Sequence, residues 1–306
     1  MRLCAILKGE KRKEKEESAV RSYQVLVDAA ADLTEALRNQ YHIGQACHCQ
    51  FAREQSCTLP PYQCALEQEG NRTFSTEELE AMFQAVFCRY AKEDIDILYL
   101  ACAGSLFPFF AIAQTVAKEV MGAYPSVRIE VYDTTLFGAG QGMLAVEAAA
   151  LRNRGEDMDA VLNRLNDMCE RAFLYIALDK PKTNGPLGKR KHRGLALGCI
   201  VGLCPVFGVG RQCGFTVLAR GRGFDNTVQL AVKMAKRDFS SETPIHFSFS
   251  CEWEGLEEVK NNLGDNVVVS HTSPLVGKLF GQNGVILAGV LPSRESDQDQ
   301  QAESIF

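Results

Sequence analysis

The chain has 306 residues, a formal charge of −5 and 46% hydrophobic residues, so it can bury a large core, and its length is typical of two domains. It has no basic excess, which argues against nucleic acid as the main partner. No apolar run is long enough to span a membrane, and the N-terminus lacks the layout of a signal peptide. We therefore expect a cytoplasmic protein without stable membrane insertion.

Strands and helices alternate along the first half of the chain. Residues 1–21 carry a mixed-charge run that predicts a solvated arm. The hydrophobic pattern then predicts a strand at Tyr23–Val27, a helix at Glu35–Gln40, a strand around Ile43–Phe51, a helix at Leu79–Lys92 behind an N-cap at Ser75, strands at Ile97–Ala101 and Val127–Tyr132, and a helix at Met158–Ala172. This order favours an α/β domain of residues 22–171, with a mostly parallel sheet and helices on both faces.

The stretch Asp96–Ala117 is the centre of this half. Its first part, Ile97–Ala101, is an apolar run typical of a strand buried on both faces. Gly104 permits a sharp turn, and apolar residues at helical spacing follow from Leu106, with Pro108 in the first turn. Backbone N–H groups converging at this turn are suited to holding an anion or a carboxylate. A plain strand-to-helix connection with nothing bound is the alternative that the stretch by itself favours.

A glycine-rich segment follows the strand Val127–Tyr132. Gly138, Gly140 and Gly142 precede a helix, but they do not follow the first strand as a dinucleotide-binding fingerprint requires. We therefore predict no cofactor. Ligands of such a sheet are expected at the carboxyl ends of its strands, near Asp28, Ala103 and Asp133.

The second half changes character. Its predicted elements are strands at Phe173–Ala177, Pro205–Val209, Phe215–Arg220, Ile245–Cys251 and Val285–Val290, with helices at Asp225–Arg237 and Leu256–Leu263. They predict an α+β domain of residues 172–292 with an antiparallel sheet. Residues 293–306 form an acidic, polar tail that we expect to be disordered.

Twelve cysteines raise the question of metal binding. Six of them lie in apolar segments, where a reduced thiol acts as a small hydrophobic group, namely Cys88, Cys102, Cys169, Cys199, Cys204 and Cys251. The spacing of Cys47, Cys49, Cys57 and Cys64 matches no common zinc pattern. A metal at Cys47 and Cys49 stays open as an alternative, but we predict packed or surface thiols.

Six short motifs follow one another along the chain. They are Val27–Leu33 (VDAAADL), Ala103–Leu106 (AGSL), Asp133-Thr134 with Gly140, Gly188-Lys189 followed by Cys204–Val206, Ala219–Arg222, and His271–Leu275 (HTSPL) with Gly277. Their order and spacing resemble those of the DegV family of bacterial fatty-acid-binding proteins, over roughly Tyr23 to Leu291. The resemblance implies a two-domain DegV-like fold.

The resemblance also implies a function. In that family the two domains enclose a buried acyl chain, and a Thr, a Ser, an Arg and a His hold its carboxylate. The protein presents the fatty acid to a separate ATP-dependent kinase for phospholipid synthesis and has no known catalytic residue. For this chain the implied ligand-binding residues are Ala103, Gly104, Ser105, Lys189, His271, Thr272, Asn71 and Thr73.

Several of these positions depart from the family pattern. Ala103 replaces the serine, and Lys189 replaces the arginine, which keeps the charge but loses bidentate geometry. The threonine motif is not recognisable, and Asn71, Thr73 and Ser75 are the nearest polar residues. His271 matches outright, and we predict that its ring points toward Gly104 rather than into solvent.

These departures keep more than one function open. The first is a carrier that binds typical fatty acids more weakly than an intact relative, or that prefers a different head group. The second is a divergent relative with a decayed head-group site, which binds another apolar ligand or a protein partner. The third, an enzyme using a cysteine or a metal at Cys47 and Cys49, lacks an evident Cys–His–acid constellation.

Overall fold

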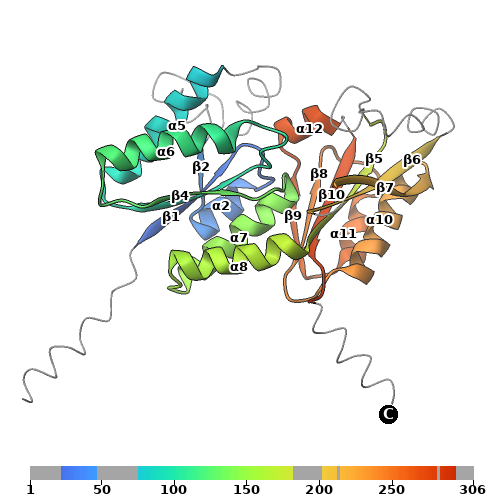
Figure 1. Ribbon diagram of the computed structural model, residues 1–306. Coiled ribbons are helices and arrows are strands. Elements are labelled where there is room, and N and C mark those ends of the chain that lie inside the picture. Colours follow the sequence, from blue (N-terminus) through green and yellow to red (C-terminus); the bar gives the residue numbers. More distant parts are fainter. Residues whose placement is uncertain (1–21, 47–74, 182–201, 212–213, 281–282, 294–306) are drawn as a thin grey trace, which may run out of the picture.

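The computed structural model describes residues 22–46, 75–181, 202–211, 214–280 and 283–293. The strands of this part form two sheets that lie side by side, each covered by helices (Figure 1). The predicted two-sheet α/β fold is therefore confirmed. Within the described ranges, no helix is long and apolar enough to cross a membrane.

The first sheet is parallel throughout. Its strand order is β2-β1-β3-β4, and the strands are β1 (Tyr23–Asp28), β2 (Gly44–Ala46), β3 (Asp96–Ala101) and β4 (Ile129–Asp133). The strand predicted at the centre, β3, lies between β1 and β4, and all six of its residues are buried. A continuous apolar run is what a strand with both faces covered requires.

Helices cover both faces of the parallel sheet. Figure 1 shows α5 and α6 on one face and α7 and α8 on the other. The helices of this half are α2 (Glu35–Tyr41), α5 (Thr76–Ala91), α6 (Phe109–Ala123), α7 (Ala139–Asn153) and α8 (Met158–Arg171). The N-cap predicted at Ser75 is confirmed, because its hydroxyl accepts from the backbone N–H of Glu78 at 3.2 Å. The helix predicted from Leu106 begins only at Phe109, and Pro108 is its N-cap.

The second sheet is mixed. Its strand order is β7-β6-β5-β10-β8-β9, and the strands are β5 (Ala172–Leu178), β6 (Leu203–Gly210), β7 (Gly214–Arg222), β8 (Ile245–Phe249), β9 (Val267–His271) and β10 (Gly284–Val290). Neighbouring strands are antiparallel except for the parallel pair β8 and β9. A helical crossover connects that pair, as parallel strands require. The helices of this half are α10 (Phe224–Asp238), α11 (Leu256–Leu263) and α12 (Pro274–Phe280).

Helix α7 packs against both sheets. It contacts β1 and β3 of the parallel sheet and β5, β8 and β10 of the mixed sheet. Its small residues make this possible. A Cβ at Gly140 would lie 3.1 Å from Leu174 of β5, and a Cβ at Gly142 would lie 3.0 Å from the backbone oxygen of Asp32. Gly140 thus permits close approach of α7 to the second half, and Gly142 permits its close approach to the loop after β1.

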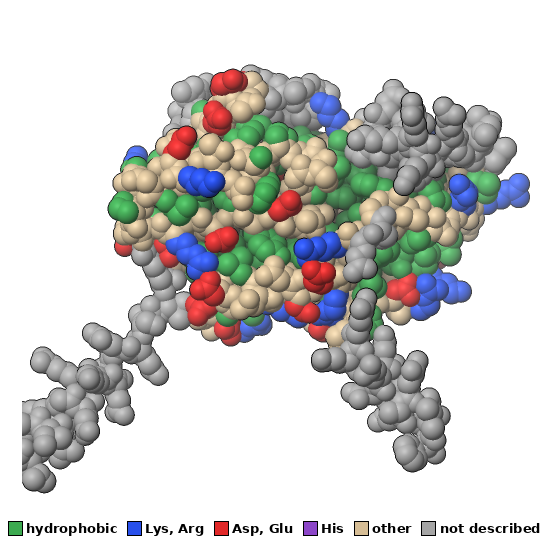
Figure 2. All heavy atoms as spheres, viewed as in Figure 1, with side chains coloured by type: hydrophobic (Ala, Val, Ile, Leu, Met, Phe, Trp, Pro, Cys, Tyr) green, Lys and Arg blue, Asp and Glu red, His purple; other side chains and the backbone are tan. Residues whose placement is uncertain are grey.

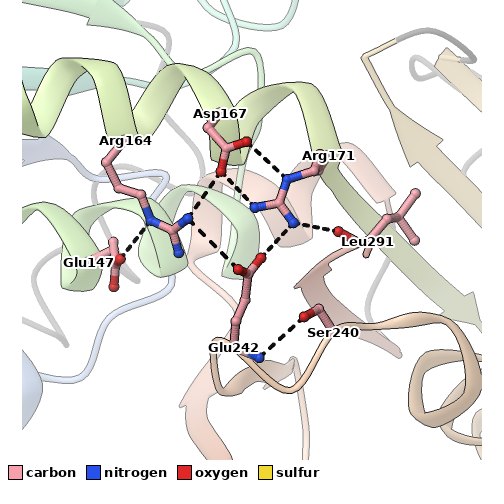
Figure 3. Close-up of polar contacts among 7 residues, drawn as sticks. All are labelled: Glu147, Arg164, Asp167, Arg171, Ser240, Glu242 and Leu291. Carbon is pink, nitrogen blue, oxygen red and sulfur yellow. Dashed lines mark hydrogen bonds and ion pairs between the residues drawn. The ribbon is translucent and has the colours of Figure 1, made fainter. Parts of the chain in front are cut away.

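An ion-pair network fixes the junction between α8 and β5. Arg171, the last residue of α8, donates to Asp167 at 2.6 Å, to Glu242 at 2.6 Å and to the backbone oxygen of Leu291 at 2.7 Å (Figure 3). Arg164 also donates to Asp167, at 3.0 Å. Figure 2 shows acidic and basic side chains intermixed along the lower edge of this face. The network ties α8 to the end of β10 and to the loop before β8.

Candidate functional site at the carboxyl end of the parallel sheet

The loops after β1 and β3 are joined by one buried carboxylate. Asp28, the last residue of β1, is 1% exposed. Its Oδ1 accepts from the N–H of Ala30 at 2.9 Å, and its Oδ2 accepts from the N–H of Cys102 at 2.7 Å and the hydroxyl of Tyr99 at 3.0 Å. Burial raises the pKa of this carboxyl, while the three donors favour its charged form. Asp28 therefore holds together the loops at the carboxyl end of the sheet.

The anion seat predicted at Gly104 is filled by the chain itself. Three successive N–H groups at the end of β3 donate to Asp28, to the backbone oxygen of Leu136 at 2.8 Å and to Oδ1 of Asp133 at 3.3 Å. The same Asp133 oxygen accepts from the N–H of Thr135 at 2.9 Å. This arrangement fits the alternative of a plain strand-to-helix connection. Of the predicted ligand residues at this turn, Ala103 is buried, and Gly104 and Ser105 are exposed.

A second buried carboxylate links the two halves. Asp32 is 1% exposed, and its Oδ2 accepts from the hydroxyl of Ser248 on β8 at 2.6 Å. Its Oδ1 accepts from the N–H of Ser273, just before α12, at 2.7 Å. Burial raises the pKa of Asp32 to about 7, against the opposing effect of these hydrogen bonds. Gly138 lies against this carboxylate, since a Cβ there would be 2.8 Å from Oδ2.

A small cavity lies beneath α12. Its volume is about 10 Å³, which is close to the space of one water molecule. The wall is apolar except for Ser250 and Thr272, and the lining residues are Ile176, Leu178, Ser250, Thr272, Val276, Gly277, Phe280, Gly284 and Ile286. Phe280 also stacks on Phe137 of the first half, with ring centroids 5.1 Å apart. Aromatic side chains thus occupy the junction beside the cavity.

His271 does not point where the sequence predicted. Its side chain is exposed, and its ring packs on Phe249 with centroids 4.5 Å apart. In the parallel pair β8 and β9, Phe249 is opposite His271 and Ser248 is opposite Ser270. Because side chains alternate along a strand, His271 shares the face of Phe249, opposite to the face on which Ser248 meets Asp32. The prediction that the ring points toward Gly104, away from solvent, is therefore wrong.

Some predicted residues lie outside the described residues. These are Asn71, Thr73 and Lys189 of the implied ligand site and Cys47, Cys49, Cys57 and Cys64 of the metal alternative. Within the ranges that the structure describes, no group of three His, Cys, Asp or Glu residues is placed to hold a metal ion. The thiol of Cys102 is buried, and burial raises its pKa well above the usual value.

Two parts of this site were missed from the sequence. One is α12, although Ser273-Pro274 carries a signal for a helix start, since serine is a frequent N-cap and proline suits the first turn. The Ser273 hydroxyl indeed accepts from the N–H of Val276 at 3.3 Å. The other is the contact of Asp32 with Ser248, which are 216 residues apart. No local pattern predicts such a pairing.

Comparisons with known proteins agree with this architecture. The DegV family of uncharacterised proteins matches residues 22–263. The DegV domain-containing protein YteA of Lactococcus lactis is 21% identical over 252 residues, which are 78% of this chain and 86% of that protein. The DegV domain-containing protein CPE0026 of Clostridium perfringens is 21% identical over 218 residues, 69% of this chain and 75% of that protein.

Solved structures share the fold at low identity. A stearic acid-binding protein from Eubacterium ventriosum superposes with a TM-score of 0.68 at 15% identity, covering 88% of this chain and 98% of its own. A fatty acid-binding DegV family protein from Streptococcus agalactiae gives 0.64 at 16%, covering 90% and 100%. These structures show the same fold, and the family match covers most of the chain. The protein belongs to the DegV family.

Proposed function

We propose that this protein is a non-catalytic carrier that holds a long-chain fatty acid, or a similar amphiphile, in a buried tunnel between two domains, residues 22–171 and 172–292. The observation that carries the proposal is the apolar cavity beneath α12, whose lining residues all belong to the second half. The ring of one of them, Phe280, stacks on Phe137 of the first half, so the cavity lies beside the junction along which the tunnel would open. Relatives with the same fold are described as binding stearic, vaccenic and heptadecanoic acid. An apolar wall with few polar groups at one end suits an amphiphile.

The cavity must widen to accept an acyl chain. Its volume of about 10 Å³ is far below the roughly 300–1,000 Å³ of pockets for small molecules. Helix α12 has only seven residues, and its Gly277, which lines the cavity, has no atom within 4 Å of its Cβ position. In this proposal α12 and Phe280 move outward as the ligand enters. Each buried CH₂ then contributes about 0.8 kcal/mol of affinity.

We further propose that the carrier presents its ligand to an ATP-dependent fatty-acid kinase, as the family resemblance implies. The chemistry would then belong to the partner, and this chain would supply binding and shielding of the acyl tail. A pull-down with a purified fatty-acid kinase, with and without bound palmitate, tests this step. We expect a complex that forms preferentially with the loaded carrier, and equal or absent binding in both states contradicts it.

Ligand analysis tests the carrier function. The purified full chain is extracted and analysed by mass spectrometry for acyl lipids, and its affinity for palmitate is measured by fluorescence displacement. Ile176→Phe adds bulk to the cavity wall and should reduce both the retained lipid and the affinity. Ile245→Phe adds the same bulk on the opposite face, where Ile245 packs beside Phe247, and serves as the matched control. Equal behaviour of the two variants contradicts a ligand beneath α12.

The second candidate is a relative with a decayed head-group site that binds another apolar ligand or a protein partner. The observation that favours it is the closed turn after β3, where the N–H of Gly104 already donates to Asp133. A folded protein that retains no acyl lipid and binds no palmitate supports this candidate over the carrier.

A further inference from the structure

A chain of hydroxyl groups connects the cavity to Asp32. Thr272 lines the cavity, and its hydroxyl lies 3.4 Å from the hydroxyl of Ser248. Ser248 is completely buried, and its hydroxyl lies 2.6 Å from Oδ2 of Asp32. The cavity is therefore in contact, through two hydroxyls, with a buried carboxylate that belongs to the other half of the molecule.

The direction of this chain follows from the number of protons. A charged carboxylate can only accept, so Ser248 uses its single O–H to donate to Asp32. The hydroxyl of Thr272 must then donate to the oxygen of Ser248, because Ser248 has no second proton. Thr272 then has no O–H left to donate, so its oxygen can offer a ligand head only a lone pair. A ligand head beside Thr272 has to supply the donor.

The remaining contacts hold Asp32 in this role. Its Oδ1 accepts from the N–H of Ser273 at 2.7 Å, and Gly138 and Ala139 at the start of α7 lie on the other side. None of these three residues is charged. The carboxylate therefore depends on fixed dipoles rather than on a cation for its stabilisation.

Three titratable groups lie on the strands and loops next to this carboxylate. Asp28 is the last residue of β1, just before the loop that holds Asp32, and it has its own donors. Cys102 lies in the loop after β3, and burial raises the pKa of its thiol well above the usual value. His246 lies two residues before Ser248 on β8, and burial lowers its pKa to about 3. Cys102 and His246 are therefore uncharged near neutral pH, so neither adds a charge change there.

We propose that Asp32 is a positioning residue that, through Ser248 and Thr272, makes the cavity select an acyl ligand with a hydrogen-bond-donating neutral head, such as an alcohol or an amide, over a carboxylate. The inference rests on the proposed carrier function and names the class of its ligand. A carboxylate head would place two acceptors together at Thr272, next to the charge of Asp32. Leaving buried acceptors unpaired is costly, so the two classes of head should separate clearly.

Protonation of Asp32 reverses the chain. A protonated Asp32 can donate to Ser248, which then donates to Thr272, which in turn donates to the ligand head. Binding of a carboxylate is then coupled to uptake of one proton by Asp32. Burial raises the pKa of this group to about 7, so affinity for a carboxylate should rise as pH falls from 8 to 6.

Two probes of equal chain length test the selection, namely 1-hexadecanol and palmitate, by fluorescence displacement at pH 8 and pH 6. At pH 8 the wild-type full chain should bind 1-hexadecanol more tightly by about tenfold or more, and the preference should shrink at pH 6. Equal affinities at pH 8, or a tighter palmitate complex, overturn the inference and leave the carrier function standing. Binding of neither probe overturns both.

Variants of the chain assign the selection to its residues. In Asp32→Asn the amide can donate to Ser248 and still accept from Ser273, so the preference for the alcohol and its pH dependence should disappear. Asp157→Asn is the control, because it removes the same charge and keeps a good N-cap for α8 at the other end of the sheet. Thr272→Val removes the acceptor itself and should abolish the preference for 1-hexadecanol over palmitate. This variant tests the inference even if Asp32→Asn does not fold. An unchanged preference in these two variants refutes the role of Asp32.

Discussion

Gly138→Ala should be among the most destabilising small substitutions in this protein. Gly138 has φ 57° and ψ −129°, a region that residues with a Cβ rarely adopt. A Cβ there would lie 2.8 Å from Oδ2 of Asp32 and 3.0 Å from Cδ1 of Ile286. Both neighbours are buried, and Asp32 is held by Ser248 and Ser273. The new methyl group therefore meets atoms that have little freedom to move.

Gly155→Ala separates the backbone cost from the packing cost. Gly155 also has a positive φ, 89°, but no atom lies within 4 Å of its Cβ position. Backbone strain alone costs about 1–3 kcal/mol, and overpacking in a rigid site adds about 1–3 kcal/mol. We expect a loss of unfolding free energy of about 1–2 kcal/mol for Gly155→Ala and about 3–5 kcal/mol for Gly138→Ala.

Urea denaturation of both variants and the wild type measures the difference. Fluorescence of Trp253 reports on the second half, and far-UV circular dichroism reports on the whole chain. Equal losses in the two variants would mean that the contacts of Gly138 with Asp32 and Ile286 cost nothing, which would refute the close junction on which the site depends.

Three further predictions concern hydrogen-bonded polar groups. Arg171→Lys keeps the charge, but a lysine cannot reach Asp167, Glu242 and Leu291 together, so this variant should lower the unfolding free energy by about 1–3 kcal/mol. Arg128→Lys, in the exposed pair with Asp159, should lower it by less than about 1 kcal/mol in the same urea titration. Tyr99→Phe removes the hydroxyl that donates to Asp28 and should lower the unfolding free energy by about 1–3 kcal/mol. Tyr132→Phe removes a hydroxyl that bonds to Asn166 in an exposed position and should lower it less. Equal losses in the two variants would contradict a charged Asp28 that needs the Tyr99 donor. Burial raises the pKa of Asp32 from 3.8 to about 7, so its stabilising contribution is complete below pH 4 and is lost as pH rises through 7. Between pH 5 and pH 8 the stability of the wild type should therefore fall relative to Asp32→Asn by about 3 kcal/mol, and parallel pH profiles would refute the shift.

The sheet core was predictable because its signals are local. The run Ile97–Ala101 has no charged residue and its side chains are apolar apart from the Tyr99 hydroxyl, as is typical of a strand covered on both faces, and it forms the buried centre of the parallel sheet. Ser75 followed by acidic residues marked the start of α5 for an equally local reason. The parallel pair β8 and β9 was not predicted, because pairing direction depends on the path of α11 and not on the strands themselves.

The site was less predictable because its contacts join distant segments. The strand-turn-helix pattern predicts a free N–H group at Gly104, because it shows no local acceptor. In the folded chain this N–H donates to Asp133, 29 residues later. The prediction of the His271 orientation was wrong for a different reason. A motif match fixes the position in the sequence, whereas the alternation of β9 fixes the face, and that face carries Phe249.

These two outcomes have a common consequence for ligand recognition. The turn after β3 lacks the serine of the family at Ala103, and its N–H groups are satisfied within the chain, so a ligand head there would have to displace Asp133. Thr272 belongs to the motif that matches the family, and it still lines the cavity. Polar recognition would then shift from the first half of the molecule to the second, where the available group is an acceptor set by Asp32. A site that loses donors and keeps an acceptor should change the class of its ligand rather than only weaken its binding.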